Sequence, residues 1–227
     1  MCFIVQRLKI VYFIRPILRG RDIKRYGNEF ADLWLINTHN GIKEKGIKPI
    51  NIEDYPAIKC HLDKYWNELS KRADQGDTPY NLRNCTYMED FSKQKIMYPN
   101  MTKYLPFYLD TEGYYQNDKS FMIIGNNISY LTAFLNSSLF KFCYIEDFPE
   151  LQGGTRELRK IFLDKIPVLL ISDTINNLFE KMINTVQLKS SQNQNTKDIE
   201  VEIDNLLFDL YNLTSQEKEA IGFIEIQ

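Results

Sequence analysis

Basic side chains crowd the beginning of the chain, and their types suit contact with a polyanion. Residues 1–26 hold seven Lys or Arg and one acid, Asp22. Guanidinium groups form paired hydrogen bonds with phosphate or with guanine, so a loop carrying several of them fits a nucleic acid. We predict a nucleic-acid-facing patch in which Arg19 and Arg21 lie nearest to the bases. The members of this patch are Arg19, Arg21, Lys24 and Arg25.

The same loop has a second interpretation. Its arginines would then belong to a basic turn and pair with acids elsewhere in the chain. Gly20 frees the backbone between two arginines, and Asp22 is expected to cap the following turn rather than to touch a ligand. Both interpretations stay open at the level of the sequence.

Three further places carry residues suited to phosphate contacts. An irregular stretch over 72–83 begins and ends with arginine. Two lysines spaced by two share one face of a strand, where they would track phosphates or simply meet solvent. A Gly-Gly pair at 153–154 permits close approach of the backbone to another surface, or forms an ordinary connecting loop. The further candidates are Arg72, Arg83, Lys93, Lys95, Gly154, Thr155 and Arg156.

The distribution of charge favours a nucleic-acid partner although the net charge is −2. Residues 1–103 contain 18 Lys or Arg against 12 Asp or Glu, whereas residues 104–227 contain 10 against 18. The halves therefore carry net charges of +6 and −8. The field near a surface follows the local arrangement of charges, so a basic face on an acidic chain can still bind a polyanion. A solvated basic edge is the alternative.

The sequence shows no complete catalytic centre. Motifs for phosphate loops, for nucleophile elbows and for zinc proteases are absent, and only two histidines are present. The four cysteines form no CxxC pair, which argues against a zinc site or a disulfide framework. Glu89, Asp90 and Lys95 together hint at a small metal-dependent nuclease, but their spacing departs from the Glu-x-Lys pattern. We expect a non-catalytic chain.

Both strands and helices must position these residues. β-Branched and aromatic residues predict strands over 8–18, 32–37, 95–98, 107–110 and 120–124. Apolar residues at spacings of three and four predict helices over 51–71, 128–143, 172–190 and 197–211, with a third tail helix from about Ser215. The helix over 128–143 is expected to be almost wholly buried.

These elements predict an α+β fold with a mixed sheet and a C-terminal helical tail. The expected domains are 1–168 for the α+β domain and 169–227 for the tail. No apolar run approaches the roughly 20 residues that cross a bilayer. The first residues do not have the pattern of a signal peptide, because no small-residue cleavage site follows them. We therefore expect a cytoplasmic protein without a membrane partner.

An ordered series of motifs resembles the TaqI-like C-terminal specificity domain of bacterial type IIG restriction-modification enzymes and DNA adenine N6-methyltransferases. The series begins with Ile-Arg-Pro-Ile-Leu-Arg-Gly-Arg-Asp-Ile-Lys-Arg-Tyr at 14–26, and Pro-Tyr-Asn-Leu at 79–82 has Tyr80 where relatives often have tryptophan. The remaining segments are 33–36, 61–73, 91–99, 135–137, 153–156, 166–168 and 203–217. Each motif is weak alone, but their order is informative.

The resemblance implies a target-recognition domain that reads double-stranded DNA. It would position a methyltransferase and fused nuclease, carried on the same polypeptide or on a separate subunit. S-adenosylmethionine and Mg²⁺ are implied only for those catalytic parts, because this chain lacks the Asn-Pro-Pro-Tyr motif and an S-adenosylmethionine loop. The alternatives are a type I-like specificity subunit, the small nuclease described above, and an interaction protein without a nucleic-acid function.

Overall fold

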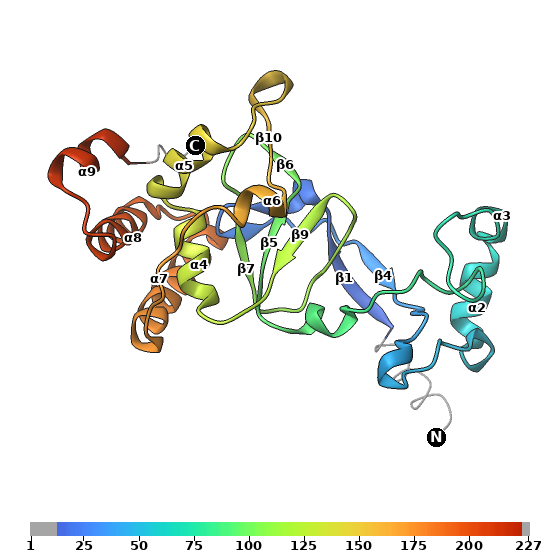
Figure 1. Ribbon diagram of the computed structural model, residues 1–227. Helices are drawn as coiled ribbons and strands as arrows, with labels where there is room; N and C mark the ends of the chain where they lie inside the picture. Colours follow the sequence, from blue (N-terminus) through green and yellow to red (C-terminus); the bar gives the residue numbers. More distant parts are fainter. Residues whose placement is uncertain (1–12, 224–227) are drawn as a thin grey trace. The chain divides into compact units, whose positions relative to one another are not determined.

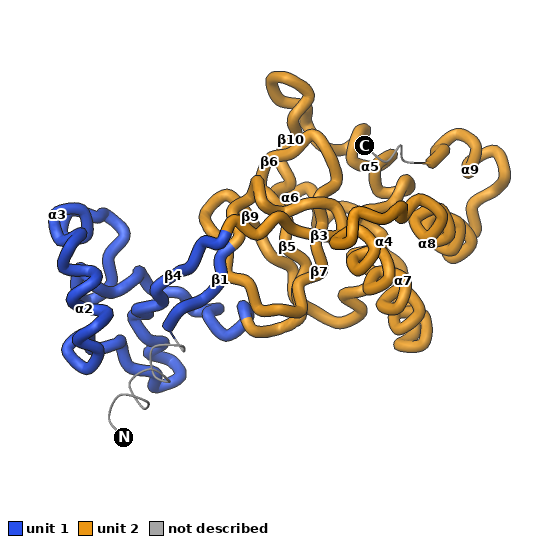
Figure 2. Tube along the Cα trace, turned by 180° about the vertical axis from the view of Figure 1, so that it is seen from behind, with its two compact units in different colours: residues 1–17, 32–91 blue, residues 18–31, 92–227 orange. Residues whose placement is uncertain are grey.

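Short strands and helices follow one another along the chain in a computed structural model that describes residues 13–223 (Figure 1). The predicted α+β class is confirmed. The chain forms two compact units, coloured separately in Figure 2. Unit 1 contains the chain up to Ile17 together with Asp32–Phe91, and unit 2 contains Leu18–Ala31 together with the chain from Ser92 onward. The segment 18–31, which carries the basic loop, therefore belongs to unit 2.

Unit 1 is built around one pair of strands and two short helices. Strand β1 (Ile14–Leu18) pairs antiparallel with β4 (Trp34–Ile36), with Arg15 opposite Leu35. Its helices are α2 (Pro56–Asp63) and α3 (Trp66–Leu69), and its 3-10 turns are η2 (Lys43–Lys45) and η3 (Ile52–Asp54). The small core of this unit contains Phe13, Ile52 and Ile58.

Unit 2 has a three-stranded antiparallel sheet at its centre. Strand β5 (Lys95–Pro99) lies between β7 (Tyr108–Asp110) and β9 (Ser120–Ile123), and every residue of β5 is buried. A strand covered on both faces reads as a continuous run without alternation. The minor strands are β2 (Ile23–Lys24), β3 (Gly27–Asn28), β6 (Met101–Thr102), β8 (Tyr115–Gln116) and β10 (Arg156–Glu157).

Helices α4 (Ile128–Leu135) and α7 (Asp173–Ser191) pack together in the main core of unit 2. The core also takes side chains from α5 (Ser138–Asp147) and α8 (Lys197–Leu210). The other helical segments of this unit are α6 (Lys160–Leu163), α9 (Ser215–Ile221), η1 (Gly20–Asp22) and η5 (Gln152–Gly154), and η4 (Met88–Ser92) leads into β5.

The tail helices share the core of unit 2 instead of forming a compact unit of their own. Phe179 of α7 and Leu207 of α8 are fully buried in the same cluster as Ile96 and Phe107. The division into domains 1–168 and 169–227 stays a prediction. Helix α9 begins with a capping box between Thr214 and Glu217.

Two long helices expected from the sequence are broken in the structure. The segment 128–143 divides into α4 and α5 at Asn136 and Ser137. The Ser137 hydroxyl accepts from the Phe140 backbone N–H at 3.1 Å, so a new helix starts there. Helix α4 is buried as expected, whereas Lys141 and Phe142 of α5 are exposed. The segment 51–71 divides into η3, α2 and α3.

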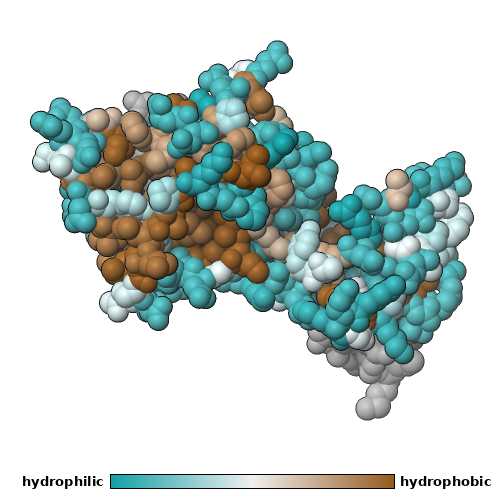
Figure 3. All heavy atoms as spheres, in the orientation of Figure 1, coloured by the Kyte–Doolittle hydropathy of each residue, from teal (hydrophilic) through white to brown (hydrophobic). Residues whose placement is uncertain are grey.

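The expected strand over 8–18 is described only from Phe13, and its first five residues lie outside the described residues. Figure 3 shows apolar side chains gathered over α4 and α7 in unit 2. Large apolar residues that stay exposed in this unit include Phe121, Ile124, Val168, Leu170 and Leu178.

Candidate DNA interface

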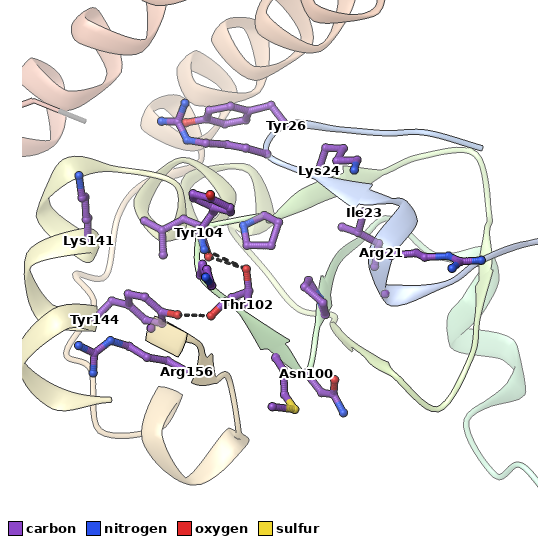
Figure 4. Close-up of a pocket in the computed structure, with 18 of the residues that line it drawn as sticks. Arg21, Ile23, Lys24, Tyr26, Asn100, Thr102, Tyr104, Lys141, Tyr144 and Arg156 are labelled. Carbon is purple, nitrogen blue, oxygen red and sulfur yellow. Dashed lines mark hydrogen bonds between the residues drawn. The ribbon is translucent and has the colours of Figure 1, made fainter. Parts of the chain in front are cut away.

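A groove of about 1240 Å³ lies in unit 2 next to the basic loop (Figure 4). Residues 20–26 form one wall, and residues 99–106, which include β6, form another. Helix α5, the turn η5 and the facing ends of α7 and α8 complete the lining. Segments far apart in the sequence therefore meet at one hollow.

The groove is strongly basic. Among the described residues that line it, seven are Lys or Arg and one, Glu200, is acidic. The basic ones are Arg21, Lys24, Arg25, Lys103, Lys119, Lys141 and Arg156. Like charges gathered on concave walls strengthen the local positive potential, which attracts a polyanion.

Three of these cations are exposed and have no acidic partner at ion-pair distance within residues 13–223: Arg21, Lys103 and Lys141. Lys24 lies 3.2 Å from Glu29, and Lys119 lies 2.9 Å from Asp118. Exposed ion pairs contribute little free energy, so a phosphate can displace their carboxylates at small cost. Five cations of the groove are thus available to a ligand.

Gly20 lets the basic loop lie directly on the neighbouring backbone. A β-carbon at Gly20 would lie 2.5 Å from the carbonyl oxygen of Lys119 and 3.4 Å from the β-carbon of Pro99. The first of these distances is shorter than any tolerable carbon–oxygen contact, so a side chain there would force the loop or its neighbour to move. Glycine therefore brings Arg21 and Lys119 to the same wall of the groove.

Arg19 is engaged by its own neighbour. Its Nε and Nη2 atoms donate to the Asp22 carboxylate at 2.8 and 2.7 Å, and its backbone N–H donates to the same carboxylate at 2.9 Å. The Arg19 guanidinium holds the pKa of the Asp22 carboxyl below its ordinary value. Asp22 closes the 3-10 turn Gly20–Asp22, of which it is the last residue, and does not cap a following turn, because strand β2 begins at Ile23. The basic-turn interpretation describes Arg19, which is not among the described groove-lining residues.

Arg25 lines the groove, but its side chain is bound to other residues of unit 2. It forms an ion pair with Glu200 and donates to the backbone oxygen of Asn136 at 2.7 Å, and burial lowers its pKa. Its guanidinium carbon lies 4.9 Å from the centre of the Tyr26 ring. Arg25 thus fixes the loop, whereas Arg21 and Lys24 extend from it.

The Gly-Gly turn borders the groove through Gly154, and its close approach to another surface stays a prediction. Gly153 and Gly154 have φ values of 75° and 78°, and the space where their β-carbons would lie is open. Glycine serves the left-handed backbone here. The Arg156 side chain donates to the backbone oxygen of Phe148 and pairs with Glu150 at 3.3 Å, so it supports the groove wall. The Thr155 hydroxyl donates to the backbone oxygen of Gln152 at 3.1 Å.

The candidates of the 72–83 stretch lie in unit 1 and are not among the described residues that line the groove. Arg72 donates to the backbone oxygens of Asn81 at 2.6 Å and Pro79 at 3.3 Å, which closes its own loop. Arg83 is exposed and lies 3.5 Å from Asp74. Arg72 is occupied structurally, and Arg83 stays a prediction.

The assignment of Lys95 to a DNA contact is wrong. Its side chain is 0% exposed and forms an ion pair with the equally buried Asp110. Lys95 and Lys93 therefore do not form an exposed pair, and Lys93 alone is exposed. The buried pair also removes the lysine on which the nuclease alternative depends.

Sequence reasoning missed three cations and one aromatic residue of the groove: Lys103, Lys119, Lys141 and Tyr104. Lys119 and Lys141 lie far from the basic loop in sequence and in separate elements. No local signal marks them. Lys103 and Tyr104 are adjacent, and a basic residue next to an aromatic one is a signal that the sequence does contain.

S-adenosylmethionine and Mg²⁺, which the resemblance implies for the catalytic parts, stay expectations. Residues 13–223 contain no cluster of three His, Cys, Asp or Glu side chains able to hold a metal ion. The sequence also lacks a glycine-rich nucleotide loop. No helix of the described part is long and apolar enough to cross a membrane.

A basic groove on a mixed α+β unit is typical of a nucleic-acid-binding module. Residues 15–168 match the model of the TaqI-like C-terminal specificity domain, which covers more than half of the chain. The chain belongs to this family, and the resemblance seen in the sequence is confirmed. Domains of this family serve sequence-specific DNA recognition in restriction-modification enzymes and are generally non-catalytic.

Proposed function

We propose that the basic groove of unit 2 holds the duplex that this specificity domain reads. The observation that carries the proposal is the set of exposed cations, Arg21, Lys103 and Lys141, which have no acidic group at ion-pair distance among residues 13–223. All three line the same groove from separate parts of the chain, and Figure 4 shows Arg21 and Lys141 on opposite sides of it. Phosphate oxygens of a bound duplex would supply the ion-pair partners that residues 13–223 do not give these three cations.

The two kinds of cation suit different tasks. Lys103 and Lys141 are compact point charges, which suit phosphates and fix the register of the DNA without reading it. Arg21 carries a planar fork that matches the O6 and N7 atoms of guanine in the major groove. Arg21 is therefore the residue that we assign to sequence reading, and Lys24 and Lys119 support it on the same wall.

The domain would act for an adenine N6-methyltransferase of the type IIG class, with a fused nuclease. Such an enzyme extrudes the target base from the duplex, and a second domain must hold the DNA while the base is extruded. S-adenosylmethionine and Mg²⁺ would be bound by those catalytic parts. An Asn-Pro-Pro-Tyr motif encoded in the same gene separates this arrangement from a type I-like specificity subunit that docks separate enzymes.

The test begins with a binding sequence selected from random duplexes by the 227-residue chain. Affinity is then measured over a range of salt for Arg21→Glu, Lys141→Glu and the control Lys181→Glu, which changes an exposed lysine of α7 outside the groove lining. Loss of a phosphate contact lowers the salt slope by about one unit, whereas loss of a base contact removes the site preference.

We expect the first effect for Lys141→Glu and the second for Arg21→Glu, with the control unchanged. Wild-type slope and preference in both groove variants would reject the groove as the DNA-binding surface.

A further inference from the structure

Tyr104 is the most exposed aromatic side chain of the described residues, and it lies inside the basic groove. Its exposed fraction is 62%, and Met101 and Ile145, which also line the groove, are each 49% exposed. Aromatic rings normally gain free energy by burial. A ring left open to solvent within a charged groove points to a ligand that covers it.

The turn that carries Tyr104 is fixed by several hydrogen bonds. The Tyr104 backbone N–H donates to the Thr102 hydroxyl at 3.0 Å, and that hydroxyl donates to the Tyr104 carbonyl at 3.0 Å. The Tyr144 hydroxyl donates to the Thr102 carbonyl at 2.9 Å, and Thr102 lies opposite Arg156 in the β6–β10 pair. The ring is thus presented from an ordered turn (Figure 4).

The residue that follows anchors the turn on the other side. Leu105 is 5% exposed and belongs to the main core of unit 2. A ligand that meets Tyr104 therefore meets a ring whose backbone is already ordered, which lowers the entropic cost of binding.

Cations surround this ring on both sides. In the view of Figure 4 Tyr104 lies between Lys141 and the pair Arg21 and Lys24, and Lys103 precedes it in the sequence. A ligand that satisfies both the charges and the ring must be anionic and must offer a flat apolar face. Nucleic acids combine phosphates with bases of this kind, and aromatic side chains in basic grooves stack on bases.

In an intact duplex the base faces cover one another. A side chain stacks on a base only where a step has opened, and wedges of this type hold DNA in an unstacked form. We propose that Tyr104 stacks on a base face exposed at an opened step of the bound duplex and stabilises that distorted DNA. This proposal rests on the groove being the DNA-binding surface.

The proposal predicts a preference for DNA that is already opened, because the cost of unstacking then falls. The probes are the selected duplex and the same duplex with one central mismatch, each labelled for fluorescence anisotropy. Three substitutions are compared: Tyr104→Ala, Tyr104→Phe and Tyr65→Ala. Tyr65 is 50% exposed in unit 1 and serves as the matched control.

We expect the wild-type chain to bind the mismatched duplex about tenfold more tightly than the paired one. Tyr104→Ala abolishes this preference and leaves the salt slope unchanged, whereas Tyr104→Phe and Tyr65→Ala retain it. A 2-aminopurine base at the mismatch reports stacking directly, because its fluorescence is quenched by wild type and by Tyr104→Phe but not by Tyr104→Ala.

An unaltered mismatch preference and quenching in Tyr104→Ala would overturn the stacking role, and so would a wild-type chain without either effect. Failure of the groove itself looks different: Arg21→Glu and Lys141→Glu would then bind like wild type. Circular dichroism and thermal melting of each variant check that the exposed substitutions leave the fold intact.

Discussion

The Arg25 guanidinium of the basic loop is ion-paired with the Glu200 carboxylate of α8. Glu200 is almost completely buried, and it also accepts from the Thr196 hydroxyl at 2.6 Å. The family match ends at residue 168, so the loop is anchored by a helix outside the matched segment. The one acidic residue of the described groove lining thus holds the loop in place.

Replacing Glu200 with glutamine should weaken DNA binding, although it removes a negative charge from a basic groove. The change leaves Arg25 partly buried without its counter-charge, which costs about 3 kcal/mol of folding stability when a buried pair is broken. Urea denaturation and DNA affinity measure the two effects. Glu202→Gln, at an exposed site of the same helix, should change neither. Tighter DNA binding by Glu200→Gln with unchanged stability would contradict the anchoring role.

Lys95→Met should destabilise the protein far more than Lys93→Met. Lys95 is the buried partner of Asp110, whose carboxylate also accepts from the backbone N–H groups of Glu112 and Tyr114, each at 2.9 Å. Removing one partner of such a pair costs about 3–5 kcal/mol, whereas an exposed substitution changes stability by about 0.5 kcal/mol or less. Equal urea midpoints for the two variants would show that the buried pair is dispensable.

Gly20→Ala should disturb the basic loop, because the new methyl group collides with the Lys119 carbonyl. Overpacking of this kind costs about 1–3 kcal/mol, and the shifted loop should bind DNA more weakly. Gly27→Ala is the matched control, since the nearest atom to its added carbon, the Ser190 hydroxyl oxygen, is 4.0 Å away. The melting temperature and the DNA affinity of both variants test this prediction. Equal changes in Gly20→Ala and Gly27→Ala would argue against a close-packing role for Gly20.

The Arg19–Asp22 pair should make stability depend on pH at the acid end. The pKa of Asp22 in the folded protein is held below its ordinary value of 3.8, chiefly by hydrogen bonding to Arg19. Its contribution is therefore complete above that value and is lost as the pH falls through the lower, folded pKa. The difference in unfolding free energy between wild type and Asp22→Asn should shrink in this acidic range. A difference that is constant across the range would rule out the linkage.

The class of the fold was predictable because its elements leave local signals. The apolar spacing of α7 and α8 and the β-branched and aromatic residues of β5 indicate their types directly. The break between α4 and α5 was not predictable from periodicity, since both halves are apolar and only the Ser137 cap divides them. Apolar periodicity therefore predicts a single helix where two short capped helices share one apolar run.

The candidate site was predictable only where its residues are neighbours in sequence. Arg21 and Lys24 stand in one basic loop, whereas Lys141 joins them only through the packing of α5. The pairing of Arg19 with the carboxylate three residues later has no clear signal in the sequence, and the expected place of Arg19 nearest to the bases stays a prediction. Lys95 was misplaced because a lysine in a strand was taken as solvent-facing, and the buried Asp110 that receives it has no local signature.

The link between the basic loop and α8 bears on how new specificities can be assembled. A graft of residues 15–168 into a related enzyme would transfer the loop and leave its anchor behind. Exchange of the loop together with α8 would transfer both ends of the Arg25–Glu200 contact. In this protein the smallest unit that can be recombined between enzymes is thus longer than residues 15–168, the segment that matches the family model.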